Sequence, residues 1–174
     1  MSNTKKYVIT SITLGLIAAA SAGLIGVANL ITRDKIAQNE IDSINSGIAK
    51  IFGESAKILN EGKVEDSSYK YVSYYYEVKS NEDAGYVIRT TGSNMYGKIS
   101  LIIGFNYDEE FKSLSVITNE QTYAQTLVDN YLVPLNEGSR DLNDVSCGAT
   151  YGAKLVRDMV NEASKTIVEK VWEK

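Results

Sequence analysis

An uncharged apolar run near the N-terminus constrains the fold of this chain more than any other feature. From Tyr7 to Thr32 the sequence contains no Asp, Glu, Lys or Arg, and most of its residues are apolar. A helix needs ~20 such residues to cross the hydrocarbon core of a bilayer. We therefore predict a transmembrane helix over residues 7–32, preceded by a short cytoplasmic tail of residues 1–6.

The residues around this run bear on its orientation and its fate. Lys5 and Lys6 precede it, so the positive-inside bias predicts a cytoplasmic N-terminus and an extracytoplasmic C-terminal domain. Arg33 and Lys35 follow it and oppose that asymmetry. The alternative is a cleaved signal peptide with its small-residue site in residues 18–22. Because the apolar run continues past that site, the sequence favours a single-pass anchor in the cell membrane.

Composition excludes several kinds of function. The chain has 174 residues, a formal net charge of −4 and no His. Without His, neither a Ser-His-Asp triad nor a His-based zinc site can form. The lone Cys147 permits no internal disulfide. The negative charge argues against a nucleic-acid partner, because binding DNA or RNA requires a basic face.

The segments after the anchor predict an α+β fold, with an antiparallel sheet and covering helices. Isoleucines at helical spacing predict a helix over about residues 34–52, in a connecting segment of residues 33–60. Residues 61–174 then form the folded domain. Runs rich in β-branched and aromatic residues, separated by turn residues, predict an antiparallel meander of four strands. These strands cover residues 69–79, 85–91, 96–105 and 111–118.

Two further helices are predicted toward the C-terminus. The first covers residues 119–132 and is expected to end at Pro134 and Gly138. The second is amphipathic through residues 155–171. Before it stands Asp144-Val-Ser-Cys-Gly-Ala-Thr150, which we expect to open this helix. Unpaired N–H groups at a helix start bind anions, and small residues there let a phosphate approach the backbone.

At this motif the chain resembles the FMN-binding domain family. That family includes the G subunit of Rnf-type ion-translocating oxidoreductases and the C subunit of sodium-translocating NADH:quinone reductase. Its signature is Asp-x-x-(Ser/Thr)-Gly-Ala-Thr, and its last Thr is esterified to FMN by a flavin transferase. Asp144, Gly148, Ala149 and Thr150 stand at matching positions, with Cys147 where Ser or Thr is usual.

The resemblance implies a membrane-anchored electron-transfer flavoprotein subunit, a redox carrier rather than a stand-alone enzyme. Its expected partners are other membrane subunits of a redox complex and the flavin transferase. We expect neither catalytic residues nor a metal site of its own. The implied cofactor is FMN, held covalently by a Thr150 phosphoester. The expected cofactor-binding residues are Thr150, Ser146, Cys147, Gly148, Ala149, Asp144, Gln121 and Thr122.

Each of these residues also has a simpler interpretation. Asp144 or Ser146 could cap the helix, Cys147 could be a small buried thiol, and Gln121 or Thr122 could cap a helix start. The tyrosines at 71 and 74–76 could be sheet residues, or one or two of them could stack on a flavin.

Departures from the family pattern motivate a second hypothesis. Gly152 and Ala153 replace the usual Thr-Ser pair, and residues 121–124 replace the family's Glu-Thr-Pro-Gly. A structural or binding subunit that has lost the flavin is therefore the alternative.

Overall fold

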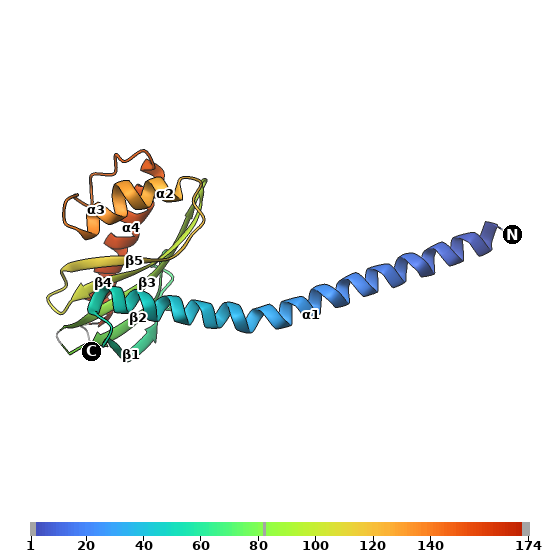
Figure 1. Ribbon diagram of the computed structural model, residues 1–174, viewed down its shortest axis with the longest axis horizontal. Coiled ribbons are helices and arrows are strands. Elements are labelled where there is room, and N and C mark those ends of the chain that lie inside the picture. The colour runs from blue at the N-terminus through green and yellow to red at the C-terminus, as the bar shows by residue number, and fades with distance from the viewer. Residues whose placement is uncertain (1–2, 82, 172–174) are drawn as a thin grey trace. The chain divides into compact units, whose positions relative to one another are not determined.

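The computed structural model describes residues 3–81 and 83–171 and divides the chain into two compact units at Asp42 and Ser43. The first unit is the N-terminal part of helix α1 (Asn3–Phe52) (Figure 1). Its stretch Lys5–Leu30 is long and apolar enough to cross a membrane, and none of it is buried in the protein. The predicted apolar helix is confirmed.

Helix α1 runs without a break to Phe52 and then stops. Gly53 has a φ of +91°, and its N–H donates to the carbonyl of Ala49 at 2.9 Å. A glycine in this left-handed conformation is a common helix terminator. The helix therefore ends at Phe52, as the isoleucine stripe predicts, within the connecting segment 33–60.

The second unit is built on one sheet in which five antiparallel strands lie in chain order. The meander and the α+β class are confirmed, but the sheet has one strand more than predicted. The missed strand, β1, is exposed over nearly its whole length and lacks an apolar stripe. The strands are β1 (Lys57–Lys63), β2 (Val72–Lys79), β3 (Ala84–Asn94), β4 (Gly97–Asn106) and β5 (Phe111–Asn119).

The last turns of α1 pack on one face of this sheet. Ile48 and Ile51 are buried there against a cluster that includes Val87 and Ile102. The contact is close, because a Cβ on Gly104 would lie 2.4 Å from Ile51 Cγ2. The stripe from Ile44 onward thus contributes to one of two hydrophobic cores, whereas Ile41 is exposed.

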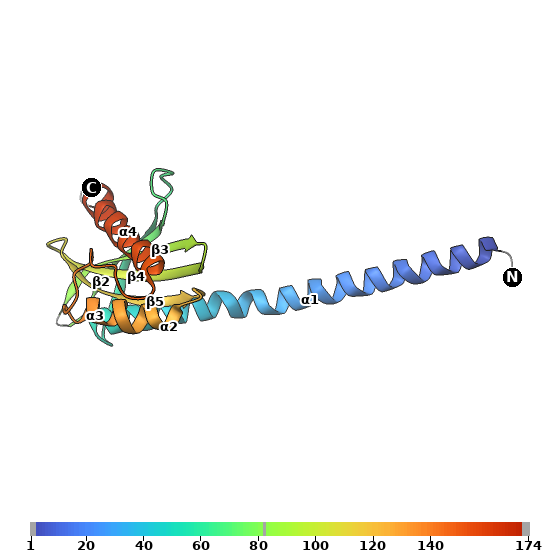
Figure 2. The same cartoon turned by 90° about the horizontal axis from the view of Figure 1, so that it is seen from above.

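The other core lies between the opposite face of the sheet and the C-terminal helices. Helix α4 (Thr150–Thr166), which continues as the π-helical turn η2 (Ile167–Val171), lies across the sheet (Figure 2). Leu155 and Met159 approach the backbone of Gly92 in β3, where a Cβ would lie 2.8 Å from Leu155 Cδ1. This packing fixes where α4 begins, and α4 begins at the candidate site.

A continuous helical segment precedes this site and corrects one prediction. It comprises α2 (Ala124–Leu127), the π-helical turn η1 (Val128–Leu132) and α3 (Val133–Asn136). The predicted helix over 119–132 begins later, and Pro134 lies inside α3 instead of ending it. Proline has no N–H, and it is tolerated where a new helical turn starts. The π turn shifts the bonding register just before Pro134, so that Val133 N–H donates to Val128 O.

Candidate functional site

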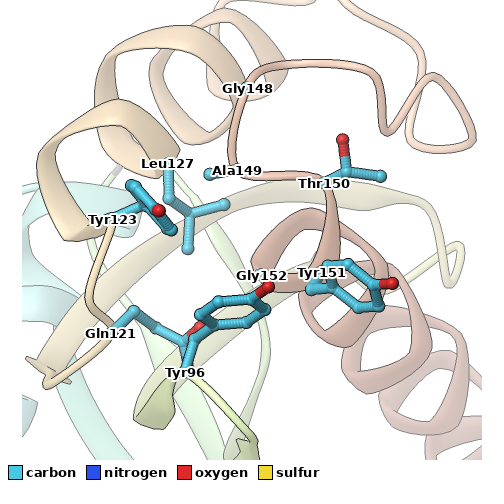
Figure 3. A pocket seen from close by; sticks show the side chains of 9 residues that line it. All are labelled: Tyr96, Gln121, Tyr123, Leu127, Gly148, Ala149, Thr150, Tyr151 and Gly152. Atoms are coloured by element: carbon cyan, nitrogen blue, oxygen red, sulfur yellow. The ribbon is translucent and has the colours of Figure 1, made fainter.

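A cavity of about 270 Å³ opens at the start of α4 (Figure 3). It is formed by the β3–β4 turn, the segment leading into α2, and the first residues of α4. Four of the eight expected cofactor-binding residues line it, namely Gln121, Gly148, Ala149 and Thr150. The lining residues are Tyr96, Gln121, Tyr123, Leu127, Gly148, Ala149, Thr150, Tyr151 and Gly152.

The backbone at this helix start has unused donors. Ala149 is the N-cap residue, and no side chain caps it. The first N–H to be paired within the helix is that of Ala153, which donates to Ala149 O at 3.0 Å. The N–H groups of Thr150, Tyr151 and Gly152 therefore lack intrahelical acceptors, as the first N–H groups of any helix do. Together with the helix dipole they favour an anion at this position.

Gly148 explains why the motif carries a glycine. Its φ is +82°, a left-handed conformation that other residues adopt only with strain. A Cβ there would also lie 3.3 Å from Thr126 Cγ2 of α2. The turn therefore needs glycine to bring the chain from Cys147 into α4.

The side chain of Thr150 is half-buried, and its hydroxyl has no hydrogen-bond partner among the described residues. In Figure 3 this hydroxyl points away from the ring of Tyr151. A hydroxyl that is held by no other group is available for acylation or phosphorylation-type chemistry without the loss of a structural bond. The geometry is therefore compatible with esterification.

Three tyrosines meet in the cavity. The ring centroids of Tyr96 and Tyr123 are 5.7 Å apart, and those of Tyr96 and Tyr151 are 5.4 Å apart. Tyr123 is 52% exposed and Tyr151 57% exposed, so both rings keep a free face. A flat aromatic ligand could stack on these rings, since aromatic pairs favour such centroid distances.

Sequence reasoning missed these tyrosines and considered others. Tyr74 and Tyr76 lie on β2, stacked on each other with centroids 6.4 Å apart. Neither of them, nor Tyr71 or Tyr75, lines the cavity. Only Tyr151 could have been found from the sequence, because it directly follows Thr150.

Gln121 and Thr122 anchor the segment before α2 to the β3–β4 turn. Gln121 is buried and its amide nitrogen donates to the carbonyl of Gly97. Thr122 Oγ1 donates to the carbonyl of Tyr96 at 3.1 Å. Neither side chain caps α2, whose N-cap Tyr123 has no side-chain bond. Gln121 lines the cavity and Thr122 does not, although Thr122 helps to hold Tyr96 in place.

Asp144 and Ser146 lie in the loop before α4 and do not line the cavity. Asp144 Oδ1 accepts the N–H of Ser146 at 3.3 Å, and Oδ2 pairs with Arg140 Nη1 at 3.3 Å. Arg140 also donates to the Asp144 carbonyl at 2.7 Å. The suggestion that either residue caps α4 is therefore wrong, because their polar atoms organise the loop instead.

Cys147 is buried in the main core, as its simpler interpretation predicts. Its carbonyl accepts a hydrogen bond from Asn130 Nδ2 at 3.1 Å. The neighbouring Tyr131 is fully buried and donates its hydroxyl to Leu142 O at 2.5 Å. Burial raises the pKa of Tyr131 to about 12. These contacts attach the loop before α4 to the η1 turn.

Fold and site together define a small α+β protein with an N-terminal apolar helix and a tyrosine-lined pocket at a helix start. The comparison with known families gives a closer match: residues 1–48 match the family model described as the RnfG N-terminal region. The resemblance to an RnfG-type protein is thereby confirmed for this part of the chain. The match suggests a subunit of a multi-subunit Rnf complex, and the apolar helix suggests single-pass membrane anchoring. No curated protein matches the chain.

Proposed function

We propose that this protein is a membrane-anchored electron-transfer flavoprotein subunit of an Rnf-type complex, with FMN esterified to Thr150. One observation carries the proposal. The Thr150 hydroxyl is unbonded among the described residues and stands at a helix start with unpaired N–H groups, next to exposed tyrosine rings. The RnfG N-terminal match supports the kind of complex.

The residues present fit FMN. The open N–H groups of α4 suit its phosphate, and the rings of Tyr96, Tyr123 and Tyr151 suit its isoalloxazine. The cavity of about 270 Å³ is slightly smaller than the ~300–1,000 Å³ that is typical of small-molecule pockets. A ring bound here would stay partly outside, accessible to redox partners. When bound, FMN supplies the electron-transfer chemistry, and the protein supplies its position and surroundings.

Attachment uses Thr150 as a nucleophile in a reaction catalysed by a separate flavin transferase. Its Oγ1 forms a bond to the FMN phosphorus of FAD, the P–O bond of the pyrophosphate breaks, AMP leaves, and the hydroxyl proton is released. The chain contributes the exposed approach to Thr150 and the backbone donors for the phosphate oxygens. Covalent attachment keeps the cofactor on the protein outside the cell, where free FMN would be lost.

The proposed topology places the N-terminus in the cytoplasm and the folded domain outside. Lys5 and Lys6 before the apolar helix support it through the positive-inside bias. The proposed partners are the other membrane subunits of the complex and the flavin transferase.

Intact mass tests the proposal. The full chain, purified from membranes that contain an active flavin transferase, should gain about 438 Da, the mass of FMN less water. Peptide mapping should place the gain on Thr150, and Thr150→Val should lack it. Thr118→Val is the matched control, because Thr118 is exposed on β5, outside the pocket.

A second candidate function is a structural subunit without flavin. It is favoured by the burial of Cys147, Gly152 and Ala153, which offer no polar side-chain group to a phosphate beyond a buried thiol. An unmodified mass under the same conditions would refute flavinylation and support this candidate.

A further inference from the structure

A second cavity lies away from the tyrosine pocket and shares no residue with it. Its volume is about 150 Å³. It is formed where the chain enters β2 and where β3 and β4 approach their connecting turn. The lining residues are Lys70, Tyr71, Thr91, Gly92, Ser93 and Lys98.

One side of this cavity is an open strand edge. Strand β2 begins at Val72, and the last hydrogen bond on this edge joins Thr91 N–H to Tyr71 O at 2.8 Å. Alternate residues of a strand direct their N–H groups to the same edge. The N–H of Ser93 therefore points to this edge too, where no described residue accepts it. The Ser93 hydroxyl is exposed beside it.

Two lysines that form no described ion pair line this cavity. Lys70 and Lys98 both line it, and neither forms an ion pair with any described carboxylate. Lys70 Nζ lies 4.9 Å from the centroid of the Tyr71 ring, which holds the ammonium beside the cavity without neutralising it. In a chain with a formal net charge of −4, two unpaired lysines in one hollow form a local positive site.

We propose that this cavity binds a phosphate-type oxyanion. The two ammonium groups, the Ser93 N–H and the Ser93 hydroxyl provide charged and neutral donors from the segment before β2, from β3 and from β4. Phosphate oxygens take such mixed donor sets, and charge-assisted bonds are the stronger ones. The ligand is either the headgroup of an anionic lipid or a soluble phosphate, which present the same oxygens to these donors.

The test uses the full-length ¹⁵N-labelled protein in uncharged maltoside micelles. Inorganic phosphate is titrated at constant ionic strength in one arm, and short-chain phosphatidylglycerol is added to the micelles in the other. The Ser93 amide shift is followed in both. Lys70→Gln/Lys98→Gln is compared with Lys57→Gln/Lys79→Gln, a control pair of exposed lysines that are partners across β1 and β2, outside this cavity.

We expect a saturable Ser93 shift that the first double variant weakens about tenfold or more and that the control weakens less than twofold. Saturation at lower concentration by phosphatidylglycerol identifies the headgroup as the ligand, and the reverse identifies soluble phosphate. A Ser93 amide that does not shift in either arm overturns the proposal. Equal weakening by both variants also overturns it, because the general field of the protein would then explain the binding.

Discussion

Glu162 provides the most direct test of how α4 is held on the sheet. Its Oε1 accepts two backbone hydrogen bonds, from Tyr71 N–H at 2.5 Å and from Val72 N–H at 3.1 Å. Both donors stand where the chain enters β2, at a register shift against β3. The carboxylate therefore supplies an acceptor that the sheet does not provide, and it joins the helix that begins at Thr150 to the start of β2.

The expected loss in the free energy of unfolding follows from these two hydrogen bonds. A hydrogen bond to a charged partner contributes ~1.5–3 kcal/mol, and less when the group is half-exposed. Glu162→Ala removes both acceptors and should lower the free energy of unfolding by about 3 kcal/mol. Glu162→Gln keeps a neutral oxygen of the same shape, so it should lose only about 1 kcal/mol. For a domain of this size these losses correspond to roughly 10 °C and 4 °C in Tm.

Near-UV circular dichroism of the full chain in maltoside micelles measures these changes, because it reports tyrosine packing and α1 carries a single tyrosine, the exposed Tyr7. Glu120→Ala is the control, since it removes an exposed carboxylate with no side-chain bond among the described residues. The reasoning fails if Glu162→Ala melts within about 0.5 kcal/mol of the unmodified protein. It also fails if the Gln and Ala variants are equally destabilised.

Three further predictions concern the edge of the sheet, the core and the pocket. The Asn136 side chain bonds both the N–H (2.8 Å) and the carbonyl (2.9 Å) of Leu114 on edge strand β5. Asn136→Ala should therefore lower the free energy of unfolding by ~1–3 kcal/mol and speed hydrogen exchange of the Leu114 amide. Because burial raises the pKa of Tyr131 to about 12, its contribution to stability is complete below pH ~10 and is lost as the pH rises through 12. Urea unfolding should therefore show a decline between those pH values that is smaller in Tyr131→Phe. If flavin stacks on Tyr96, Tyr96→Leu should lower the ratio of docked to undocked flavin ring about fivefold, which corresponds to ~1 kcal/mol of stacking. Flavin fluorescence should increase in Tyr96→Leu and stay unchanged in Tyr96→Phe, which keeps an aromatic ring.

The elements with strong periodicity could be predicted from the sequence. The apolar run, the tyrosine-rich and aliphatic strands and the amphipathic last helix each bury one surface, and burial is what periodicity reports. Strand β1 buries almost nothing, because it is held by backbone pairing to β2. A strand of that kind leaves no pattern in its own residues. Pro134 misled in another way: its missing N–H is accommodated by the π turn, which depends on tertiary packing.

The residues of the candidate site that are adjacent in sequence could be predicted, whereas those brought together only by the fold could not. Gly148, Ala149 and Thr150 are neighbours in the chain and line the cavity together. Tyr96 and Tyr123 reach the same cavity from other segments, brought there by the bonds of Gln121 and Thr122 to the β3–β4 turn. No local pattern marks such residues, because their position depends on long-range pairing.

The pair Gly152-Ala153, which stands where the resembled family has Thr-Ser, packs together with Gln121. A Cβ on Gly152 would lie 3.0 Å from Leu127 Cδ2 and 3.4 Å from Gln121 Oε1, and Ala153 is fully buried. A side chain at 152 would require the Leu127 side chain to shift slightly, and a larger residue at 153 would have to enter the packed core. The amide of Gln121 lies next to the place that a side chain at 152 would occupy, so the cavity retains a polar atom there. Gly152-Ala153 and Gln121 therefore belong to one packing arrangement, in which the first turn of α4 approaches α2 closely and Gln121 lines the pocket.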